Sequence, residues 1–151
     1  LRRLIQKGAN PHLWSADIRF ANALQLVAYY GKMELASVLM LITRIIDDMQ
    51  LGGQYGTALG AACANGKVKV VDALLQAGAS LNVNGGHYGT ALGTACANGK
   101  VEVVNALLQA GASPNADGGQ YGTALCAACA NGMSEIVDAL LGAGASLNND
   151  G

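Results

Sequence analysis

Two cysteines in a Cys-x-x-Cys spacing, Cys126 and Cys129, are the residues of this 151-residue chain with the clearest potential for chemistry. At the start of a helix such a pair can act as a redox dithiol, because the helix dipole lowers a thiol pKa. The same spacing could supply half of a zinc site. However, neither His12 nor His87 stands at a spacing that would supply the missing ligands.

The cysteines also recur with the surrounding sequence, which favours a packing role. Cys129 follows Cys96 and Cys63 at a constant spacing of 33 residues, each time among small residues. We therefore predict core cysteines, and a thiol or metal site at the Cys-x-x-Cys pair is the alternative. The sequence contains no nucleophile elbow, zinc-protease motif or phosphate-binding loop. We expect no catalytic residue, no cofactor and no metal ion, and hence a protein that is not an enzyme.

Three tyrosines share the same period and are the main candidates for binding. Tyr55, Tyr88 and Tyr121 each precede a Gly-Thr-Ala-Leu segment. One interpretation is a ladder of rings that pack turn on turn. The other is a rigid amphipathic stripe that binds a partner, because tyrosine offers a large contact area at low entropic cost. Packing is the favoured interpretation, and both can hold.

These residues recur because a block of 33 residues is repeated three times, from Gly52, Gly85 and Gly118. Such a period indicates stacked units, none of which can bury its apolar face alone. In the first block Thr57 is predicted to cap a short helix over residues 58–64. An Asn-Gly turn leads to a second helix over residues 67–77, which Gly78 ends in the left-handed conformation.

Glycine inside the first helix disfavours its formation. Gly60 and Gly93 in its interior should each cost ~1 kcal/mol relative to alanine. We expect a closer approach of neighbouring helices as compensation.

The block resembles the ankyrin repeat in its residues and their order. The matching positions are Thr57-Ala58-Leu59, Ala62-Cys63, Gly66, Val70-Val71, Leu74-Leu75, Gly78-Ala79 and Asn82. The resemblance implies an all-α solenoid of stacked helix-turn-helix units with projecting β-turn loops, and a module that binds another protein through a rigid concave surface. The chain differs from the family at one motif. Where the family usually has Thr-Pro-Leu-His, this chain has Thr-Ala-Leu-Gly or Thr-Ala-Leu-Cys.

The resemblance also implies where a partner binds. In this family the contacts come from turn tips and the exposed side of first helices. The corresponding positions are Gln54, Tyr55, Asn65, His87, Tyr88, Asn98, Gln120, Tyr121 and Asn131. The Gly-Gly-x-Tyr-Gly-Thr-Ala-Leu variant is similar to the nearly identical ankyrin arrays of filamentous fungal NLR-like proteins. The expected context is therefore a larger signalling or scaffold protein, intracellular and cytoplasmic, of which this chain is a fragment.

The whole chain is expected to form a single array. We divide it into the end of a partial repeat (1–13), an irregular repeat with a long second helix (14–51) and three regular repeats (52–84, 85–117 and 118–150). Nine basic and ten acidic residues leave a net charge of −1, which argues against a nucleic-acid partner. No apolar run approaches the ~20 residues that cross a membrane. End-to-end self-association of near-identical units, as a structural solenoid, is the alternative function.

Overall fold

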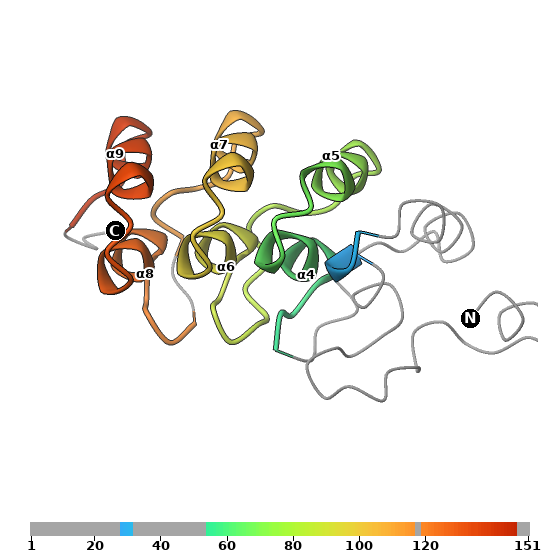
Figure 1. Ribbon diagram of the computed structural model, residues 1–151, viewed down its shortest axis with the longest axis horizontal. Coiled ribbons are helices and arrows are strands. Elements are labelled where there is room, and N and C mark those ends of the chain that lie inside the picture. Colours follow the sequence, from blue (N-terminus) through green and yellow to red (C-terminus); the bar gives the residue numbers. More distant parts are fainter. Residues whose placement is uncertain (1–27, 32–53, 117–118, 148–151) are drawn as a thin grey trace, which may run out of the picture.

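The computed structural model describes residues 28–31, 54–116 and 119–147, and this part of the chain folds into three successive helix pairs. The helices are α4 (Ala58–Ala64), α5 (Val68–Gln76), α6 (Ala91–Ala97), α7 (Val101–Gln109), α8 (Ala124–Ala130) and α9 (Ser134–Gly142). Figure 1 shows α4, α6 and α8 side by side in one row, α5, α7 and α9 in a second row, and the turns projecting on the side away from the second row. The described ranges contain no β-strand, only isolated bridge residues such as the pair Gly86 and Gly89. The predicted all-α solenoid is confirmed.

Each first helix begins where a threonine side chain caps it. The hydroxyl of Thr57 accepts a hydrogen bond from the Gly60 amide at 2.9 Å. Thr90 and Thr123 repeat the arrangement, each at 3.2 Å. Because a helix start leaves backbone N–H groups without partners, each such cap contributes about 1 kcal/mol. The predicted helix over residues 58–64 is confirmed at both ends.

The second helix of the first regular unit ends at a glycine in the left-handed region. Gly78 has φ 96°. Its amide bonds to the Leu75 carbonyl at 3.0 Å, and the Ala79 amide bonds to the Leu74 carbonyl at 2.9 Å. These two bonds satisfy carbonyls that the helix end leaves open. The helix is one residue shorter at each end than predicted, because Lys67 and Ala77 are its caps.

The apolar faces of the helices form one core that runs through all three units. Leu59, Val71 and Leu74 are fully buried in the first unit, and their counterparts are buried in the next two, apart from the half-buried Val137. A single cluster of buried residues extends from Ala28 to Leu140. Burying each leucine contributes roughly 1.5–3 kcal/mol, so neighbouring units complete each other's interior.

At the turn between the two helices of a unit, a glycine packs against a side chain of the following unit. A Cβ built on Gly66 would lie 3.1 Å from the side chain of Lys100, and one built on Gly99 would lie 3.0 Å from that of Met133. Lys67 covers Gly31 in the same way. Each of these glycines also has a positive φ. A residue from the following unit therefore lies across the preceding turn.

The expected compensation for glycine inside the first helix is wrong. A Cβ built on Gly60 would come closer than 3.0 Å to the carbonyl oxygen of Tyr55, and one on Gly93 would meet that of Tyr88. Neither oxygen belongs to a neighbouring helix. In these two units the close neighbour is the turn of the same unit, which folds back onto its own helix.

The partial repeat and the long second helix predicted in the N-terminal third lie outside the described residues, apart from 28–31. The division of the chain into units stays a prediction.

Candidate functional site

Backbone hydrogen bonds join the turn tips of successive units. The His87 amide donates to the Gln54 carbonyl at 2.7 Å, and the Gln120 amide donates to the His87 carbonyl at 2.9 Å. The three residues occupy one position of the repeat. Gln54 is half-buried, whereas His87 and Gln120 are exposed. The backbone is thus fixed at positions whose side chains remain available.

The tyrosines form stacked pairs along this side of the molecule. The rings of Tyr88 and Tyr121 lie 6.2 Å apart with only 6° between their planes. Tyr55 stacks on Tyr29 at 5.3 Å and 22°. Tyr88 and Tyr121 therefore pack on each other, as the ladder interpretation predicts, whereas Tyr55 stacks on Tyr29, a residue outside the predicted ladder.

The tyrosines differ in exposure. Tyr55 is only 7% exposed and packs against Ala61 and Ala64 of α4. Tyr88 and Tyr121 are half-buried, so each keeps part of its surface for solvent. The ring of Tyr55 is closed to a partner in this arrangement, whereas those of Tyr88 and Tyr121 are open.

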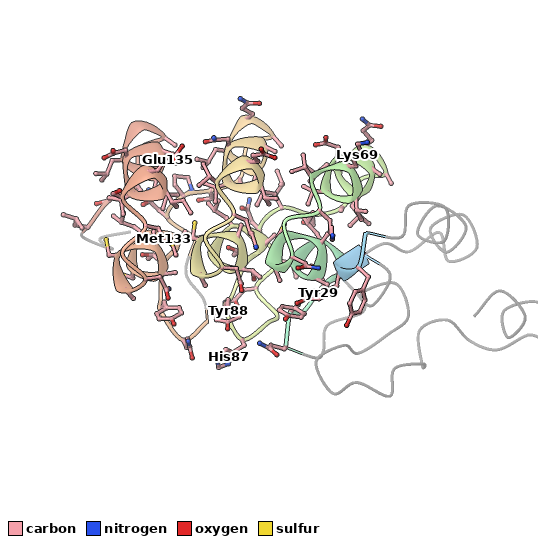
Figure 2. All side chains as sticks on the ribbon, in the orientation of Figure 1. Tyr29, Lys69, His87, Tyr88, Met133 and Glu135 are labelled. Atoms are coloured by element: carbon pink, nitrogen blue, oxygen red, sulfur yellow. The ribbon has the colours of Figure 1, made fainter. Side chains whose placement is uncertain are left out.

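His87 extends the aromatic surface outward. Its ring meets that of Tyr88 edge-on at 5.0 Å and 78°. Figure 2 shows His87 at the tip of its loop and Tyr88 on the same side, between the tip and the row of first helices. The imidazole offers a polar edge beside the tyrosine ring.

The three predicted asparagines lie at first-helix ends, and their amide groups are bonded to the backbone. Asn98 donates to the Thr94 carbonyl and Asn131 to the Ala127 carbonyl, each at 2.8 Å. Asn65 instead donates to the Tyr29 carbonyl of the preceding unit at 2.9 Å. Asn98 and Asn131 are exposed, and Asn65 is half-buried.

The charged side chains belong to a different part of each unit from the tyrosines. In the described ranges the charged side chains all lie on second helices or the residue before them: Lys67, Lys69, Asp72, Lys100, Glu102, Glu135 and Asp138. Figure 2 shows Lys69 and Glu135 on the opposite side from His87. Among the described residues, the turn tips and the first helices carry no Asp, Glu, Lys or Arg, whereas Lys67 and Lys100 lie across the turns at Gly31 and Gly66.

The cysteines divide into two classes. Cys63 and Cys96 are buried, as predicted. Burial raises the pKa of the Cys96 thiol to about 12 and raises that of Cys63 further, with a smaller contribution from Cys96 beside it. Buried thiols with raised pKa are poor nucleophiles.

The prediction of a core position is wrong for Cys126 and Cys129, which are exposed. The physical reason is that α8 belongs to the last described unit, so no following helix pair covers it in this structure. No group of three or more His, Cys, Asp or Glu side chains is placed to hold a metal ion in the part of the chain that is described. The described residues therefore supply no third ligand for the alternative interpretation, a metal site at these two thiols.

Sequence reasoning did not identify Tyr29. It lies two residues before Gly31, which aligns with Gly66, so the end of a first helix was the only signal available. The regular period does not place a tyrosine there. Its ring nevertheless continues the stack beyond Tyr55.

Comparison with known protein families gives a match over most of the described residues. The model described as "Ankyrin repeats (3 copies)" matches residues 82–150, and the model described as "Ankyrin repeat" matches residues 54–83. No curated protein matches the chain. Among the described helices none has the length and apolar character needed to cross a membrane.

Proposed function

Because the chain belongs to the ankyrin-repeat family, we propose that it binds another protein along the side that carries the tyrosines. Ankyrin repeats in general are protein–protein interaction modules. We call the binding surface the tyrosine strip, formed by Tyr88 and Tyr121 with the exposed His87, Gln120, Asn98 and Asn131. Tyr55 is left out because its ring is buried, and Gln54 and Asn65 lie at the margin.

The observation that carries the proposal is the stacked, half-buried pair Tyr88 and Tyr121 beside turn tips whose described residues include no Asp, Glu, Lys or Arg. Tyrosine provides apolar contact area together with a hydroxyl that can hydrogen-bond, and only two side-chain torsions have to be fixed. The hydrogen-bonded tips hold the strip before a partner arrives. Such preorganisation lowers the entropic cost of binding.

The same features indicate what kind of partner the strip would bind. A neutral strip gives no electrostatic steering, so the partner segment should be uncharged and rich in apolar and hydrogen-bonding groups. The strip repeats almost the same residues from unit to unit. An extended segment that is itself repetitive would match it best.

The test is quantitative affinity capture from the source organism's lysate, with the full chain and a Tyr88→Ala/Tyr121→Ala variant as baits. We expect the double variant to lose captured partner at least ~10-fold, since each anchoring aromatic contributes on the order of 2 kcal/mol. Helicity measured by circular dichroism should stay the same.

Two control baits make the result specific. The Tyr88→Phe/Tyr121→Phe variant keeps the ring area, and Lys69→Ala changes the opposite side; both should retain capture. Raising the salt from about 50 mM to about 500 mM should change binding less than ~3-fold, because no charge pair has to be screened. Undiminished capture by the double alanine variant would place the binding site elsewhere.

The cellular setting belongs to the same proposal. We place the module in the cytoplasm, within a larger signalling or scaffold protein such as those that carry fungal ankyrin arrays. Four free cysteines without a disulfide in the structure support a reducing compartment.

A further inference from the structure

The dipeptide Asn-Gly occurs four times in the chain, and one copy differs from the other three in its surroundings. Three copies, at Asn65, Asn98 and Asn131, stand at the ends of first helices. The fourth, Asn84-Gly85, lies in the loop between α5 and α6. Asn84 is exposed, but so is Asn98, so exposure of the asparagine does not distinguish the two kinds of site.

Asn-Gly is well suited to spontaneous loss of the side-chain amide. The backbone nitrogen of the glycine can attack the asparagine Cγ, because glycine places no side chain beside that nitrogen. A glycine N–H that donates to a carbonyl has to give up this hydrogen bond before its nitrogen can react. The hydrogen bonds of the glycine amides therefore decide which copy reacts.

At the three helix ends the glycine amide is engaged. The Gly66 amide donates to the Cys63 carbonyl and the Gly99 amide donates to the Cys96 carbonyl, each at 3.3 Å. Gly132 repeats the arrangement at 3.1 Å. The asparagine side chains at these ends donate to backbone carbonyls as well. Reaction at these sites requires local opening of the helix end.

The amide of Gly85 is in a different situation. It donates to no acceptor among the described residues. Asn84 is itself not without a partner, so the glycine amide is the group that separates this site from the helix ends. Its nitrogen can react without the opening of a helix.

We propose that Asn84 is a site of spontaneous deamidation, selected from the four Asn-Gly sequences by the amide of Gly85. The Gly85 nitrogen forms a bond to Cγ of Asn84, the Cγ–Nδ2 bond breaks, and ammonia leaves with the proton of the Gly85 amide. One water molecule then opens the cyclic imide and leaves an aspartyl or an isoaspartyl residue. No group is oxidised or reduced.

The reaction changes the junction between the first two regular units. It places a carboxylate in a loop, residues 77–90, that contains no Asp, Glu, Lys or Arg. The next block has Asp117 at this position of the repeat, which supports an aspartyl product compatible with the fold. The isoaspartyl product adds a carbon to the main chain just before Gly86, where a Cβ built on Gly56 would come closer than 3.0 Å to the backbone.

The experiment compares the four sites within one chain. The full chain is aged in a mildly alkaline reducing buffer, digested at acid pH, and mapped by mass spectrometry for the exchange of each asparagine amide for a carboxyl group. Asn84 should convert at least ~10-fold faster than Asn98, because the helix-end site reacts only after local opening. In denaturant the four sites should react within ~3-fold of one another, since the protection has then been removed.

One variant tests the chemistry. Asn84→Gln keeps an amide at an exposed position, but its attack by Gly85 would have to close a larger ring. Conversion at this position should stop, and the rates at the three helix ends should stay the same.

Three results would overturn the proposal: equal conversion of Asn84 and Asn98 in the folded chain, an Asn84 that reacts only in denaturant, or conversion that persists in Asn84→Gln. Neither Asn84 nor Gly85 belongs to the tyrosine strip, so the outcome does not depend on the proposed function.

Discussion

Replacing Gly60 with alanine should destabilise the protein, although alanine is the better helix former. Gly60 lies inside α4, and its backbone is not in the left-handed region. Propensity alone therefore predicts that Gly60→Ala stabilises the fold by about 1 kcal/mol. The structure predicts the opposite sign, because the new methyl group would come closer than 3.0 Å to the Tyr55 carbonyl oxygen.

The magnitude follows from what has to move. Overpacking a close contact costs about 1–3 kcal/mol. The Tyr55 oxygen also accepts the Thr57 amide at 2.8 Å, and weakening that bond adds about 1 kcal/mol. After subtraction of the gain in helix propensity, Gly60→Ala should lower the free energy of unfolding by about 2 kcal/mol.

The chain contains its own control for this prediction. The third unit has Cys126 at the equivalent position, where a Cβ is already present. Cys126→Ala should therefore change the free energy of unfolding by less than about 0.5 kcal/mol. Urea unfolding followed by circular dichroism measures both variants. A Gly60→Ala variant more stable than the unchanged chain would refute the reasoning from the turn carbonyl.

Two other properties can be tested in the same way. Gly99→Ala should destabilise by about 2–3 kcal/mol, because the new Cβ meets Met133 in addition to the strain of φ 67°; Gly132→Ala, with φ 66° and open space, should lose only about 1 kcal/mol of unfolding free energy. Stability should fall as the pH rises above about 9, because burial raises the thiol pKa of Cys63 and Cys96 and the unfolded chain then releases protons that the folded chain retains. The slope should reach at most ~1.4 kcal/mol per pH unit and per thiol. Urea unfolding at pH 8 to 11 should show a shallower decline for Cys96→Ala, and equal slopes would contradict the assignment.

The local structure of each unit could be predicted because it depends on neighbouring residues. Thr57 caps the first helix and Gly78 ends the second, as the sequence indicates. The recurring apolar residues Val70, Val71 and Leu74 are also the buried residues of the second helix. Stacking follows, since no unit has enough apolar area to stand alone.

What could not be predicted depends on position in the stack. The repeat makes Cys96 and Cys129 equivalent, yet one is buried and the other exposed. In the same way Tyr55 is closed by Tyr29, whereas Tyr121 keeps an open surface. A sequence period describes one unit at a time, and exposure is decided by which neighbours each unit has.

The glycines inside the first helix show a different limit. The sequence indicated that Gly60 needs a compensating contact. It did not indicate whether that contact is with a neighbouring helix or with the carbonyl group of a turn. Only the path of the turn distinguishes them.

Amide hydrogen exchange at the turn tips tests most directly the claim that successive units form one connected body. His87 and Gln120 are exposed loop residues, and without the stack their amides would exchange at the rate of an unstructured chain. The hydrogen bonds to the preceding tips predict exchange slowed at least ~100-fold, as expected for amides released only by separation of units. Free exchange at both tips, with the helices themselves protected, would contradict the account.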